Sequence, residues 1–155
     1  MPLPLTPGDL ADIRQTLALF AHVCDNRQED ALGLVFTEDV VFTFARSGRV
    51  LTGLGEVLAF LRHLPPEAAD HHTTDTVIMV GADGTVRALS RYLAVLPDGS
   101  VTNGEYEDVL VLVGDGWRIR SRRSIHRHPR ADGEVPSRRN PAWLPATDRV
   151  PPLGV

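Results

Sequence analysis

The chain has 155 residues, and its 43% hydrophobic and 23% charged content is ordinary for a globular protein, so we expect one domain with its own core. Its formal net charge is −4 and all 16 basic residues are arginine, which excludes a Schiff-base or P-loop lysine and disfavours a broad nucleic-acid surface. The single cysteine, Cys24, excludes an intrachain disulfide. The sequence has neither a signal-peptide pattern nor the ~18 consecutive apolar residues of a membrane helix, so we expect a cytoplasmic protein without a membrane partner.

The first part of the chain predicts three helices and two short strands. Thr6, Pro7 and Asp9 are typical of a helix start, because Thr6 can cap the first turn and Pro7 suits the first helical position. Apolar residues then recur at helical spacing to about Cys24. The elements expected next are a short helix at 29–36, a strand at 40–44, a strand at 50–52 and a helix at 55–63.

The second part of the chain predicts four strands, at 73–80, 85–96, 104–113 and 117–126. The connections contain Asp-Gly pairs, which are typical of tight hairpins, so we expect an antiparallel meander. Helices followed by strands indicate an α+β fold in which the helices cover one face of a curved sheet.

Proline recurs from Pro129 to the end of the chain, which excludes a regular helix or a central strand there. We therefore divide the sequence into a domain at 1–128 and a proline-rich C-terminal arm at 129–155. Trp143 and Leu144 would let the arm dock on its own domain or on a neighbour, and disorder is the alternative interpretation.

No short catalytic motif is present, so the candidate chemistry rests on scattered residues. Asp25 ends an apolar helix, where partial burial would raise its pKa and suit it to proton transfer or to orienting a histidine. His71 and His72 are adjacent in a predicted strand and so point to opposite faces, which argues against a metal site. From the residues alone, Asp25 as a plain helix end and His71 as a surface residue stay the simpler interpretations.

The order of these elements resembles a known family. A long helix ending in Asp-x-Arg is followed by Phe-Thr-Glu-Asp-Val-Val-Phe, Gly-x-Gly-Glu, a His strand, Ala-x-Ser-x-Tyr, Gly-x-Tyr-x-Asp and Gly-Trp-Arg-Ile. Over residues 9–126 this is similar to the SnoaL-like family of the nuclear-transport-factor-2-like superfamily, in the branch with scytalone dehydratase, bile-acid 7α-dehydratase and hexachlorocyclohexane dehydrochlorinase. The resemblance implies a cone: a strongly curved antiparallel sheet wrapped around three N-terminal helices, with an internal pocket.

The resemblance also implies a catalytic set of Asp25, His71 and Arg122. Asp25 matches the aspartate at the end of the first helix, and His71 lies four residues before Asp75, where the family usually has asparagine. Arg122, five residues after Trp117, would assist the departing group. The pocket-lining positions that the resemblance and the strand pattern imply are Phe20, Tyr92, Tyr106 and Asp108.

The implied activity is that of a cofactor-independent lyase or isomerase, which needs no metal. His71 would remove a proton from a carbon atom of a small hydrophobic, polyketide-like or steroid-like ligand while Asp25 fixes its tautomer. Three alternatives stay open: a non-catalytic binding module, a structural protein like a dioxygenase β-subunit, and an epoxide hydrolase or polyketide cyclase, the hydrolase using Asp25, Asp108 and Arg122. We expect a homodimer or homotrimer.

Two features depart from this expectation. Phe20 occupies the position where related lyases often carry tyrosine or lysine, so the site lacks that proton donor. Strand alternation also places Arg123 on the apolar face with Trp117, and Arg122 on the opposite face unless a bulge intervenes. We keep Arg122 and hold Arg123 as its alternative.

Overall fold

The computed structural model describes residues 5–114, 116–135 and 137. All the predicted helices and strands are present, with β1, β3 and β5 beginning three or four residues earlier than expected. The elements are α1 (Pro7–Asp25), η1 (Glu29–Ala31), α2 (Leu32–Val35), β1 (Phe36–Phe44), β2 (Arg49–Thr52), α3 (Leu54–His63), β3 (Asp70–Val80), β4 (Val86–Val95), β5 (Val101–Val113) and β6 (Gly116–His128). The docking predicted for Trp143 and Leu144 lies outside the described residues. None of the described helices is long and apolar enough to cross a membrane.

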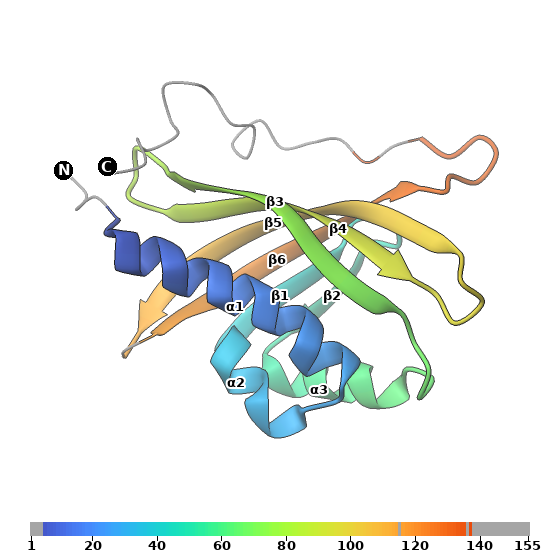
Figure 1. The fold of residues 1–155 in the computed structure, drawn as a ribbon, viewed down its shortest axis with the longest axis horizontal. Coiled ribbons are helices and arrows are strands. Elements are labelled where there is room, and N and C mark those ends of the chain that lie inside the picture. The colour runs from blue at the N-terminus through green and yellow to red at the C-terminus, as the bar shows by residue number, and fades with distance from the viewer. Residues whose placement is uncertain (1–4, 115, 136, 138–155) are drawn as a thin grey trace.

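The six strands form one curved, open sheet in the order β2-β1-β6-β5-β4-β3. α1 runs across one face of this sheet, and α2 and α3 lie on the same side (Figure 1). β3 to β6 form the predicted antiparallel meander, which confirms the α+β class. However, β1 pairs parallel with β6, so the sheet is mixed and not entirely antiparallel. The Asp-Gly turns specify the hairpins locally, whereas no local signal specifies the direction of a pairing between such distant segments.

The first turn of α1 is fixed to the beginning of β6. Thr6 and Asp9 form a capping box, in which the Asp9 N–H donates to Thr6 Oγ1 at 3.1 Å and the Thr6 N–H donates to Asp9 Oδ2 at 2.8 Å. Trp117 Nε1 donates to the other Asp9 carboxylate oxygen at 2.9 Å, and the Thr16 hydroxyl donates to the Trp117 carbonyl at 2.9 Å. These contacts set the line along which α1 crosses the sheet.

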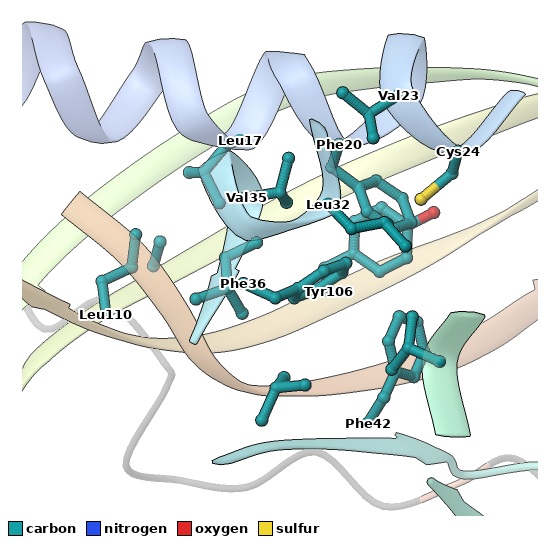
Figure 2. Close-up of a cluster of buried hydrophobic side chains, with 14 of the residues drawn as sticks. Leu17, Phe20, Val23, Cys24, Leu32, Val35, Phe36, Phe42, Tyr106 and Leu110 are labelled. Atoms are coloured by element: carbon teal, nitrogen blue, oxygen red, sulfur yellow. The ribbon is translucent and has the colours of Figure 1, made fainter. Parts of the chain in front are cut away.

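The buried face of α1 supplies one side of the core (Figure 2). Leu17, Phe20 and Val23 point from the helix toward Phe36 and Tyr106, which come from β1 and β5. The Phe20 ring meets the Tyr106 ring edge-on, with centroids 5.4 Å apart, and this geometry suits the charge distribution of aromatic rings. Phe20 is therefore the point where the helix and the centre of the sheet are packed together.

A β-bulge in β6 decides which arginine faces the helices. Val109 pairs with Ser121 and Leu110 pairs with Ile119, which leaves Arg120 as an extra residue on β6. The bulge reverses the alternation of the strand, so Arg122 shares the inner face with Ile119 while Arg123 lies on the outer face. The sequence could indicate that a bulge was needed, but not where it lies.

The side chain of Arg122 is fully buried. Its Nε and Nη2 atoms donate to the two carboxylate oxygens of Asp108 at 2.7 and 2.8 Å, and neither side chain has any exposed surface. The guanidinium carbon lies 4.1 Å from the centroid of the Phe20 ring and 4.1 Å from that of Tyr106. Two charges are tolerated in this core because they form a two-bond pair and the cation is stacked between aromatic faces.

We expect Arg122→Met to lower the free energy of unfolding by about 3–5 kcal/mol, because it leaves the Asp108 carboxylate buried without its cation. The double variant Arg122→Met/Asp108→Leu should recover most of this loss, since it buries no charge. Urea unfolding followed by circular dichroism measures both effects.

Arg120→Met is the matched control, because Arg120 forms an exposed ion pair with Asp39 at 3.3 Å and should unfold close to the wild-type midpoint. A single Arg122 variant as stable as the wild-type protein would show that the buried pair contributes nothing to the fold.

Candidate active site

An apolar cavity of about 420 Å³ lies between the end of α1, α3 and the inner face of the sheet. This volume is within the usual range for small-molecule sites. Its wall is mostly aliphatic and aromatic, and its polar groups gather in two places. One group is Asp25, Arg27 and His71, and the other consists of Arg46, Ser47, Ser124 and His126, while Thr102 lies on β5 in register with His71.

Asp25 and His71 form a hydrogen-bonded pair in the cavity wall. Asp25 is the last residue of α1, and His71 is the second residue of β3. His71 Nδ1 lies 2.7 Å from Asp25 Oδ1, and the His71 backbone N–H donates to Asp25 Oδ2 at 2.6 Å. A carboxylate beside Nδ1 keeps the proton of neutral imidazole on that atom, so Nε2 is the proton acceptor. The side chains are 15% and 29% exposed, which keeps the pair accessible from the cavity.

The chain reversal after α1 brings Asp25 to this position. Arg27 adopts a left-handed backbone conformation with φ of 54°, which turns the chain away from the helix axis. Its guanidinium donates to the carbonyl oxygens of Leu61 and Pro65, the latter at 2.6 Å. Arg27 thus fastens the end of α1 to the end of α3, a role that its place in Asp-x-Arg did not reveal.

Asp75 has a comparable backbone role in β3. Its φ of 51° coincides with a register shift between Thr74 and Val77. Aspartate and asparagine tolerate the left-handed region better than most residues do. The exchange of asparagine for aspartate that the sequence analysis noted is therefore compatible with this backbone, and His71 lies on the regular part of the strand before it.

Phe20 and Tyr92 flank the His71 ring, and Tyr106 stacks behind Tyr92. The His71 centroid is 6.4 Å from that of Phe20 and 6.3 Å from that of Tyr92, and Tyr92 stacks on Tyr106 at 4.7 Å. Burial raises the pKa of Tyr92, whose hydroxyl is hydrogen-bonded to Ser124, and it also raises the pKa of Tyr106. Both hydroxyls therefore stay protonated at neutral pH and can only be neutral donors or acceptors.

Gly104 makes room for Tyr92. The two residues are cross-strand neighbours, and a Cβ atom at position 104 would lie 2.6 Å from the Tyr92 hydroxyl oxygen and 2.1 Å from the Ile125 carbonyl oxygen. Any side chain there would displace the tyrosine ring from the cavity wall. Packing against Tyr92 and the Ile125 carbonyl therefore explains why this position of the Gly-x-Tyr-x-Asp segment is a glycine.

Arg122 and Asp108 do not line the cavity. The bulge turns Arg122 inward as the resemblance required, but Phe20, Tyr106 and Asp108 enclose its guanidinium. A group without exposed surface cannot meet a departing group in the cavity, so this position does not support the role expected for Arg122. The geometry does not support the hydrolase alternative for the same reason, since Asp108 and Arg122, two of its three residues, do not line the cavity.

Most cavity-lining residues escaped the sequence analysis as site candidates, among them Cys24 and Arg46. Cys24 lies one helical turn after Phe20, a spacing that could have revealed it. Burial raises the pKa of its thiol to about 12. Arg46 lies in the turn between β1 and β2, where no sequence pattern marks the direction of a side chain. Its Nη2 lies 2.9 Å from Glu134 Oε2.

The described residues contain no group of three or more histidine, cysteine, aspartate or glutamate side chains arranged to hold a metal ion. In the cavity, the imidazole of His71 and the carboxylate of Asp25 already engage each other. The arrangement is that of an oriented base in an apolar chamber.

A curved sheet enclosing an apolar cavity, with a His–Asp pair on its wall, defines the class of small cone-shaped α+β domains. The model of the SnoaL-like domain matches residues 8–123, and the chain belongs to this family. No curated protein matches the sequence.

Solved structures share the fold over most of the chain. ActVI-ORFA from Streptomyces coelicolor is 25% identical, with a TM-score of 0.66 over 79% of this chain and 99% of that one. Kfla4162 from Kribbella flavida is 26% identical, with a TM-score of 0.63 over 77% and 90% of the two chains. An NTF2-like protein with a cystatin-like fold from Novosphingobium aromaticivorans is 16% identical, with a TM-score of 0.68 over 81% and 86%.

We expect Cys24 to resist alkylation by iodoacetamide at pH 8 in the folded protein. A rise in the thiol pKa from 9.0 to about 12 leaves roughly 1,000-fold less of the reactive thiolate at this pH, and burial limits access further. Mass spectrometry of the intact chain measures the rate, which is unambiguous because Cys24 is the only cysteine in the sequence.

The same chain in concentrated urea provides the control and should be alkylated at the rate of a free cysteine. Equal rates in the folded and unfolded chains would contradict the buried position of the thiol.

Proposed function

We propose that this protein is a cofactor-independent lyase or isomerase in which His71 removes a carbon-bound proton from a small hydrophobic substrate. The observation that carries the proposal is the 2.7 Å contact between His71 Nδ1 and Asp25 Oδ1 at the wall of an apolar cavity. A histidine oriented in this way, with Nε2 free to accept a proton, is suited to act as a general base.

The carboxylate of Asp25 has two tasks in this mechanism. It holds the neutral imidazole in the tautomer that directs the lone pair of Nε2 toward the substrate. Once Nε2 has taken the proton, the same carboxylate stabilises the imidazolium ion that forms beside it. Its second oxygen accepts the backbone N–H of His71, so the imidazole and the backbone that carries it are oriented by one group.

In an elimination, the C–H electron pair forms the new double bond while the C–O bond at the neighbouring carbon breaks. The leaving hydroxide takes up the proton held by His71 and departs as water. In an isomerisation, the proton returns to another carbon atom of the same substrate. The neutral hydroxyl of Tyr92 on the adjacent wall is a donor for the oxygen on which negative charge develops.

The cavity wall supports a hydrophobic substrate. Most of its lining is aliphatic or aromatic, and the stacked pair of Tyr92 and Tyr106 offers a flat surface for a ring system. We therefore infer a substrate with fused rings and a carbonyl group that acidifies the neighbouring C–H bond.

We expect the protein to dehydrate 3-hydroxy-1-tetralone to 1-naphthol, which is detected by its fluorescence. Asp25→Asn and His71→Gln should each lower kcat/KM by about 10²–10⁴-fold, because they remove the orienting group and the base. His72→Gln is the matched control: its side chain belongs to the neighbouring residue of the same strand, does not line the cavity, and should leave the rate within about 2-fold.

The exchange of the α-protons of 1-tetralone into D₂O, followed by NMR, tests the base without requiring a leaving group. A wild-type protein that binds these ketones but accelerates neither reaction would instead be the binding module that the sequence left open. Full activity in His71→Gln would overturn the assignment of the base.

A further inference from the structure

The second polar group of the cavity has no task in the proposed chemistry. It comes from other elements than the base, because His71 belongs to edge strand β3 whereas Arg46 follows β1, and β4, β5 and β6 lie between these two strands in the sheet. Both residues line the same cavity, so one ligand can contact His71 at one point and Arg46 at another.

Arg46 is the arginine of the described cavity wall whose partner can be replaced by another anion. The described lining contains two arginines, and Arg27 is committed by hydrogen bonds to the backbone carbonyls of Leu61 and Pro65. Arg46 instead forms one bond to Glu134, with side-chain exposures of 48% and 21%. Such a partly solvated pair is weak and yields readily to a competing anion.

The charge of Arg46 reaches into the cavity. Burial raises the pKa of Tyr92, and the positive charge of Arg46 opposes this rise. The guanidinium is therefore close enough to the tyrosine hydroxyl to act on it electrostatically. Ser124 is hydrogen-bonded to that hydroxyl, and His126, whose Nε2 donates to the Pro129 carbonyl at 2.5 Å, lies on the same wall. These groups make this end of the cavity a place for negative charge.

We propose that Arg46 is the binding residue for a carboxylate on the substrate, whose apolar body fills the cavity toward His71. The proposal deepens the proposed function, since it names the substrate class as a fused-ring organic acid. A carboxylate suits this position because it stays at the partly solvated rim beside a cation, while only the rings are removed from water. Arginine also offers a planar pair of donors that matches the two carboxylate oxygens.

Glu134 acts as the built-in competitor for this site. Its Oε2 accepts the Ala131 backbone N–H at 2.9 Å as well as the bond from Arg46. When a ligand carboxylate displaces Glu134 from Arg46, Glu134 therefore keeps its hydrogen bond from the Ala131 N–H. The Arg46–Glu134 bond joins the short segment after β6 to the turn after β1, and the proposal requires this bond to break when the carboxylate binds.

The test compares two fluorescent probes of equal shape, anthracene-2-carboxylate and anthracene-2-carboxamide. Fluorescence anisotropy at low salt measures the affinity of each for the full chain. The wild-type protein should bind the acid more tightly than the amide. Arg46→Gln should lower the affinity for the acid by about 10-fold or more and change the affinity for the amide by less than about 3-fold. Glu134→Gln should raise the affinity for the acid, because it removes the negative charge that competes for Arg46.

Two controls separate this subsite from the catalytic proposal. Arg120→Gln removes an exposed, paired arginine outside the cavity and should leave both affinities unchanged. His71→Gln should also preserve the preference for the acid, even if no catalysis is ever found. Circular dichroism of each variant verifies its fold.

An acid preference that survives in Arg46→Gln would overturn the subsite and leave the His71 chemistry standing. The same conclusion follows if the wild-type protein binds the acid no better than the amide, or binds neither probe.

Discussion

The buried ion pair of Arg122 and Asp108 is the constraint on which the rest of the domain depends. A guanidinium in a core requires a carboxylate, a stacking partner on each face and a strand geometry that directs it inward, and the bulge at Arg120 provides the last of these. One of the stacking partners, Phe20, belongs to α1. The pair therefore fixes the helix against the sheet, and with it the position of Asp25 at the end of that helix.

This arrangement separates two uses of charge. Charges that hold the fold are buried in a two-bond ion pair, as in Arg122 and Asp108, or are tied to backbone carbonyls, as in Arg27. The charges of the candidate site, on Asp25 and Arg46, are instead hydrogen-bonded to partly exposed side chains. The sequence has no lysine, so the cations of the fold are arginines, whose charge does not vary near neutral pH.

Much of the fold could be predicted because its signals are local: a capping box at Thr6, helical spacing of apolar residues and Asp-Gly turns between strands. The contact of Asp25 with His71 was expected only through the family resemblance, since their separation in sequence carries no signal of its own. The parallel pairing of β1 with β6, the location of the bulge and the inward direction of Arg46 arise from tertiary packing. Local propensities do not encode such features, and this is why the sequence left open whether Arg122 or Arg123 faces inward.

The second hydrogen bond of Asp25 has a consequence for the edge of the sheet. β3 is an edge strand, so the backbone N–H of His71 has no neighbouring strand to pair with on its outer side. The Asp25 carboxylate accepts that N–H and thereby acts as a one-residue substitute for the missing strand. The group that orients the imidazole thus also occupies a backbone donor at the sheet edge that would otherwise be open to pairing with another chain.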